Sequence, residues 1–71
     1  MRISVRTFAG KEISLEVQPG ATIRSIKEKI QDKEDIRIDL QRLLFVNEQL
    51  ENNRSLFSYE IGEESVLHLV L

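Results

Sequence analysis

Two early runs of alternating apolar and polar residues limit the possible folds more than any other feature of this sequence. Met1 to Thr7 and Glu12 to Val17 both follow a period of two. In a strand, that period sends one set of side chains to the core and the other to water. Gly10 lies in the link between the runs, and glycine tolerates the positive φ that tight turns often require. The pattern predicts an N-terminal β-hairpin with one apolar face.

An amphipathic helix is expected after this hairpin. Thr22 offers a side-chain oxygen that can cap the first turn of a helix running from Ile23 to Glu34. Within that segment, Ile23, Ile26 and Ile30 recur at helical spacing and form one apolar stripe. We expect the stripe to pack against the inward face of the hairpin.

The second half of the chain predicts further strands. Leu40 to Val46 is rich in strand formers, and Ser65 to Leu71 alternates again. Between them, Gln49–Leu50 indicates a short edge strand and Leu56–Tyr59 a single helical turn. The order of hairpin, helix, strand, short strand and strand predicts an α+β fold in one domain, residues 1–71.

The last predicted strand is apolar on both faces. Its core-facing residues are all leucine: Leu67, Leu69 and Leu71. The opposite face carries Val66, His68 and Val70. If the strand pairs with the third strand, Leu44, His68 and Val70 form an apolar patch with Arg42 at its rim, and such patches often bind partners. Isolated exposed apolar residues are also normal in strands, so the pattern leaves both interpretations of the apolar residues open. A histidine in such a place is more often an incidental surface residue than a switch or a ligand.

The composition excludes several functions. With no cysteine and one histidine among 71 residues, neither a thiolate zinc site nor a histidine-dependent triad can form, and motifs such as HExxH and GxxxxGK[ST] are absent. A net charge of −2 gives no field for nucleic acid, and no run approaches the roughly 20 apolar residues of a membrane span. We therefore expect no catalysis, no metal, no cofactor, and no nucleic-acid or membrane partner. The expected state is a cytoplasmic or nuclear monomer, since the lack of cysteine suits a reducing compartment.

Ordered fragments along the chain resemble ubiquitin. They are MRISVRTFAGKEISLEV, TIRSIKEKIQDKE, QRLLF, QLE and ESVLHLVL, and they run in register over essentially the whole sequence. The chain is therefore identified as a member of the ubiquitin family. This resemblance implies the β-grasp fold, a mixed five-stranded sheet packed on one α-helix. It also implies non-covalent binding to ubiquitin-binding domains, conjugating or deubiquitinating enzymes and proteasome receptors.

The resemblance implies two binding patches. The first consists of Phe8, Arg42, Leu44, His68 and Val70. Ubiquitin has leucine and isoleucine at the positions of Phe8 and Leu44, so these changes keep the patch apolar while altering its shape. The second patch would use Ile36, Leu71 and again Phe8.

The resemblance also bears on covalent attachment. The possible acceptor amines are those of Met1, Lys11, Lys27, Lys29 and Lys33. Arg6, Glu48 and Glu63 stand where ubiquitin has its other lysines, so linkages at those positions are not expected. The sequence ends at Leu71, before the diglycine tail that ubiquitin uses for conjugation, and we expect no conjugation through Leu71 itself. The alternative function is a conjugatable modifier whose diglycine tail lies outside these residues.

Two further departures affect the backbone. Asp35 stands where ubiquitin ends its helix with glycine, and Val46-Asn47 replaces a turn of small residues. Aspartate and asparagine tolerate positive φ moderately, whereas valine does so poorly. Either Val46 is strained or the turn has shifted.

Overall fold

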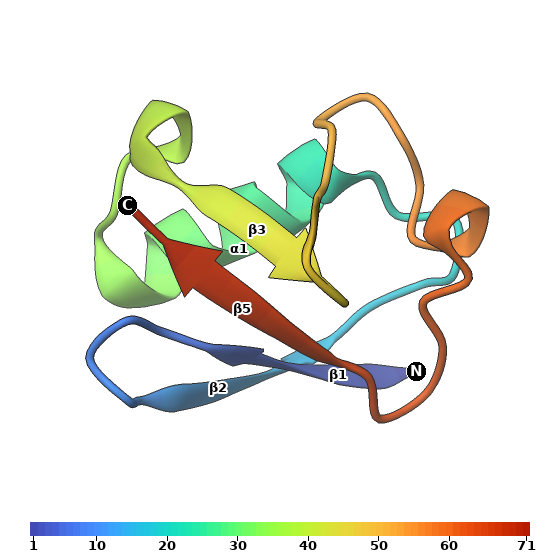
Figure 1. Cartoon of the computed structure of the whole chain (residues 1–71), viewed down its shortest axis with the longest axis horizontal. Coiled ribbons are helices and arrows are strands. Elements are labelled where there is room, and N and C mark those ends of the chain that lie inside the picture. The colour runs from blue at the N-terminus through green and yellow to red at the C-terminus, as the bar shows by residue number, and fades with distance from the viewer.

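The computed structural model describes residues 1–71 and contains a five-stranded sheet with one α-helix across it (Figure 1). The strands are β1 (Arg2–Arg6), β2 (Glu12–Glu16), β3 (Arg42–Phe45), β4 (Glu48–Gln49) and β5 (Val66–Val70). The helix is α1 (Ile23–Glu34), and two 3-10 turns are η1 (Ile38–Leu40) and η2 (Phe57–Tyr59). This arrangement confirms the predicted α+β, ubiquitin-like β-grasp fold.

The sheet is mixed, with the strand order β2-β1-β5-β3-β4. β1 and β5 run parallel, while the other three pairs are antiparallel. β5 is the central strand, because Leu67 pairs with Val5 of β1 on one side and Leu69 pairs with Leu43 of β3 on the other. The two ends of the chain therefore build the middle of the sheet.

The core lies between the inner face of the sheet and α1. It holds fourteen buried apolar residues, and the helix contributes Ile23, Ile26 and Ile30, all fully buried. Ile3 and Val5 face them from β1, also fully buried. The predicted apolar stripe therefore packs as expected, and the inward-facing residues of the hairpin lie in the core.

Both ends of α1 are capped as the sequence indicates. The backbone N–H of Ser25 donates to Thr22 Oγ1 at 3.2 Å, which satisfies one of the free amides of the first turn. At the other end, Asp35 adopts the left-handed conformation with φ 58° and its N–H donates to the Gln31 carbonyl at 2.8 Å. Aspartate is one of the residues that tolerate this conformation, so it replaces the usual glycine here.

The predicted strand boundaries were too long. Leu40 belongs to η1 and Val46 is already a turn residue, so β3 covers only Arg42–Phe45 of the predicted strand. Leu71 was expected to face the core but is 56% exposed, because the ladder with β3 ends at Val70. The edge strand lies one residue earlier than predicted, at Glu48–Gln49. The predicted helical turn exists as η2.

The turn between β3 and β4 settles the question of Val46. Phe45 pairs with Glu48, so the loop has two residues, and both have positive φ, 50° for Val46 and 65° for Asn47. A type I′ turn requires this of both central residues. The turn has therefore not shifted, and Val46 adopts a conformation that is unfavourable for a β-branched side chain.

Candidate protein-binding surface

Strand register brings four of the predicted binding residues together on the outer face of the sheet. Arg42 pairs with Val70 and Leu44 pairs with His68 across the β3–β5 ladder. Directly opposite residues of an antiparallel pair share a face, with Cβ atoms about 4.5–5.5 Å apart. We call this group of Arg42, Leu44, His68 and Val70 the sheet patch.

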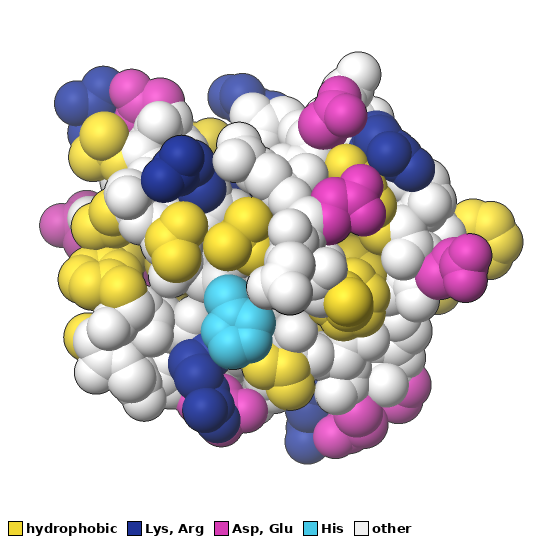
Figure 2. Space-filling view, in the orientation of Figure 1, with side chains coloured by type: hydrophobic (Ala, Val, Ile, Leu, Met, Phe, Trp, Pro, Cys, Tyr) yellow, Lys and Arg dark blue, Asp and Glu magenta, His cyan; other side chains and the backbone are white.

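The sheet patch is open to solvent. Arg42 and His68 are exposed, while Leu44 and Val70 are half-buried by their neighbours. Figure 2 shows hydrophobic side chains gathered around the single histidine, with basic side chains near them. Since α1 covers the other side of the sheet, no helix covers this face (Figure 1). A partner can therefore reach these side chains directly.

The patch extends onto β1, which sequence reasoning did not include. Arg6 pairs with His68 and Ser4 pairs with Val66 in the parallel β1–β5 ladder, so both pairs share the outer face. Val66 is 39% exposed and adds apolar area. The alternation had already placed Val66 outward, but the position of Arg6 depends on a pairing between the two ends of the chain. Two arginines therefore border the apolar residues: Arg6 lies beside His68, and Arg42 lies beside Val70.

Phe8 lies beyond the ladder, in the turn that links β1 and β2. Thr7 holds this turn, since its carbonyl accepts from Gly10 N–H at 3.0 Å and its hydroxyl accepts from Lys11 N–H at 3.2 Å. Gly10 has φ 84°, which suits glycine. Phe8 is 62% exposed, and the turn lies at the same end of the sheet as the C-terminal end of β5 (Figure 1). It is available to a partner at that end.

The second predicted patch is less uniform. Leu71 and Phe8 are exposed, whereas Ile36 is half-buried and packs against the core. Leu40 in η1 is also exposed, and sequence reasoning missed it because it was assigned to a strand. Of these four apolar side chains, three are therefore open to solvent and Ile36 is partly used for packing.

Three of the predicted acceptor lysines are exposed. Lys29 and Lys33 form no ion pair, and the Lys11 amine pairs with Glu34 Oε2 at 2.9 Å. A pair with one largely exposed partner holds the amine weakly. These three amines are reachable without disturbing the core.

Lys27 and Met1 differ from the exposed lysines. Lys27 is only 6% exposed and its amine donates to Asn52 Oδ1 at 2.6 Å. Burial lowers the pKa of Lys27 from its usual value. The Met1 amine donates to the Val17 carbonyl at 2.7 Å and pairs with Glu16 at 3.4 Å. Either amine must leave these contacts before it can act as an acceptor.

The surface hollows lie away from the sheet patch. Three are present, with volumes of about 340, 540 and 420 Å³, and none is lined by a residue of the patch. No group of three or more His, Asp or Glu side chains could hold a metal ion, and α1 is too short and polar to cross a membrane. Small-molecule sites are usually concave, so the open patch better suits a protein surface.

Comparison with known proteins gives the family. A family model described as the ubiquitin family matches residues 3–71. Over all 71 residues the chain is 41% identical to Ubiquitin-like protein 1 of Schizosaccharomyces pombe, covering 91% of that protein. It is 42% identical to Ubiquitin-like protein NEDD8 of Dictyostelium discoideum and 37% identical to NEDD8-like protein RUB1 of Saccharomyces cerevisiae, covering 92% of each. The matched family is one of ubiquitin-like proteins. By sequence and by fold, the chain belongs to the ubiquitin family.

Proposed function

We propose that this chain is a non-catalytic recognition domain that offers the sheet patch to partner proteins of the ubiquitin pathway. The observation that carries this proposal is the register that sets Leu44 opposite His68 and Arg42 opposite Val70 on the face away from the core. These side chains do not pack against α1, which lies on the other face of the sheet. Their apolar area is available for burial by a partner.

The chemistry of the patch defines the partner. The centre is aliphatic, with Leu44, Val70 and the neighbouring Val66 on one face. Arg42 forms no ion pair within the chain, and Arg6 pairs with Glu12 only at 3.6 Å between exposed side chains. A partner that presents aliphatic residues flanked by carboxylates complements this surface, because charge complementarity selects among apolar partners. Ubiquitin-binding domains, proteasome receptors, and conjugating or deubiquitinating enzymes are the proposed classes.

An NMR titration tests the location of binding. Isotope-labelled chain is titrated with a small helical ubiquitin-binding domain, and backbone amide shifts are followed. We expect the largest shifts in β3 and β5, with α1 unaffected, because the helix lies on the opposite face. Saturable shifts confined to α1, or no shift at millimolar receptor, would refute the proposed surface.

A second candidate function is that of a covalent modifier built on the same domain. Its support is that the similar proteins named NEDD8 and NEDD8-like match over all 71 residues and belong to the modifier class. The exposure of Leu71 is compatible with a tail that leaves the domain at the surface. The residues encoded after Leu71 distinguish the two: a short tail ending in Gly-Gly establishes the modifier, and a long continuing chain establishes a domain of a larger protein.

A further inference from the structure

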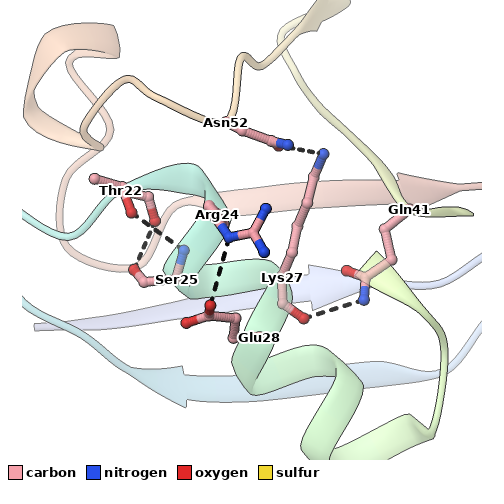
Figure 3. A network of polar contacts seen from close by, with 7 residues as sticks. All are labelled: Thr22, Arg24, Ser25, Lys27, Glu28, Gln41 and Asn52. Atoms are coloured by element: carbon pink, nitrogen blue, oxygen red, sulfur yellow. Dashed lines mark hydrogen bonds and ion pairs between the residues drawn. The ribbon is translucent and has the colours of Figure 1, made fainter. Parts of the chain in front are cut away.

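One buried cation of the domain has no anionic partner. The Lys27 amine donates to the neutral Asn52 Oδ1 at 2.6 Å (Figure 3), and no carboxylate lies within ion-pair distance of it. An ammonium has three donors, so two of its hydrogens have no acceptor within the chain. Charges are seldom buried unpaired, since loss of hydration is costly without a counter-charge. No carboxylate of the chain therefore balances the charge of Lys27 in this structure.

A hollow of about 540 Å³ lies against this lysine. It is lined by Lys27 and by residues 49–53, the segment that follows the β3–β4 turn. The backbone N–H groups of Asn52 and Asn53 donate no hydrogen bond within the chain. The residues that line the hollow therefore include Lys27, whose amine bonds to the lining residue Asn52, and two residues with unused backbone donors.

The surroundings of the hollow are held in place by backbone contacts. Arg24 N–H donates to the Asn52 carbonyl at 3.0 Å, and Ile23 N–H donates to the Arg54 carbonyl at 2.9 Å. On the other side of Lys27, the Gln41 amide donates to the Lys27 carbonyl at 3.0 Å (Figure 3). The loop and the helix that carry the donors are thus tied together before any ligand arrives, which lowers the ordering cost of binding.

We propose that this hollow binds an oxyanion, with the Lys27 amine as its counter-charge. The ligand chemistry is a carboxylate or phosphate oxygen, supplied by a small anion or by an acidic side chain of a partner. Glu51 also lines the hollow but forms no ion pair with Lys27, so its negative charge opposes an incoming anion. The site is separate from the sheet patch and does not depend on the proposed function.

Side-chain and amide NMR of the 71-residue chain tests the proposal. Sodium acetate and inorganic phosphate are the probes, and sodium chloride keeps the ionic strength constant. We expect saturable shifts of the Lys27 side chain and of the Asn53 amide. Asn52→Asp puts a carboxylate beside the amine and should weaken probe binding about tenfold or more. Glu51→Gln removes the opposing charge and should tighten it, whereas Lys33→Met, at an exposed position, should leave it unchanged.

Two outcomes would overturn the oxyanion site. One is a set of shifts that grow linearly with probe and never saturate, and the other is saturable binding of equal strength in Asn52→Asp. Lys27→Met should also abolish binding; if that variant does not fold, Asn52→Asp still decides. N-acetylglutamate amide, as a third probe, separates the two sources: stronger binding than phosphate assigns the site to an acidic side chain, and weaker binding assigns it to a small phosphate-like anion.

Discussion

Replacement of Val46 by glycine should stabilise the domain. Val46 has φ 50° in the β3–β4 turn, and a left-handed conformation costs an L-residue roughly 1–2 kcal/mol, with a larger cost for a β-branched side chain. Its side chain is 78% exposed, so removal sacrifices little packing. Glycine increases the conformational entropy of the unfolded chain, which opposes the gain by about 0.5–1 kcal/mol. The net expectation is a stabilisation of about 1 kcal/mol.

Denaturant and thermal unfolding measure this gain. For a domain of this size, about 1 kcal/mol corresponds to a rise of roughly 4–8 °C in Tm. Val46→Ala keeps the Cβ atom but removes the branch, so it should recover only part of the gain. Asn47→Gly is the matched control at the neighbouring position, where asparagine already tolerates positive φ, and it should change stability little. If Val46→Gly unfolded at the same or lower temperature than the parent, the strain assigned to Val46 would be refuted.

Three further predictions concern the core and the amines. Leu67→Ala should cost about 2–5 kcal/mol of unfolding free energy because Leu67 is fully buried, whereas Val70→Ala on the outer face should cost far less. If denaturant unfolding gave the reverse order, the assignment of inner and outer faces to β5 would be wrong. The lowered pKa of Lys27 means that the unfolded chain binds more protons between that pKa and 10.5, so stability rises with pH across this window. Lys27→Met, which keeps an apolar stem, should reduce that rise, and an unchanged pH profile would contradict the desolvation of the amine. Used as acceptor for ubiquitin with an unselective ligase, the chain should be modified at its three exposed lysines before Lys27, as peptide mass spectrometry can show; Lys27 as the first site would contradict its burial.

Local sequence patterns predict the hairpin and the helix well. Alternation depends only on neighbouring residues, and the stripe of three isoleucines together with Thr22 defines α1 from Ile23 to Glu34. The 3-10 turn Ile38–Leu40 was missed, because its apolar residues also suit the start of a strand. Strand ends depend on where the pairing partner stops, which the local pattern does not contain.

The residues of the candidate sites also differ in whether local sequence patterns can predict them. Leu44, His68 and Val70 follow from alternation and from pairing of two strands that lie near each other in the sheet. Arg6 required the parallel pairing of the first and last strands, which joins distant parts of the sequence. Lys27 lies four residues after Ile23 and therefore on the apolar stripe, so helical spacing could have indicated its burial. A charged side chain is normally expected at the surface, and only the folded structure shows that Lys27 is buried without a carboxylate beside its amine.

The affinity of patch variants for a helical ubiquitin-binding domain tests the central claim most directly. Leu44→Ala and Val70→Ala each remove apolar area that a partner would bury, and each should weaken binding by about 1–3 kcal/mol while the domain stays folded. Ser14→Ala is the matched control, because Ser14 lies on the same outer face but on the edge strand β2, beyond β1. Isothermal titration of all three against the same receptor should leave Ser14→Ala at the parental Kd and raise the Kd of the other two about fivefold or more. Equal affinity of all three variants and the parent would contradict the claim that the sheet patch is the recognition surface.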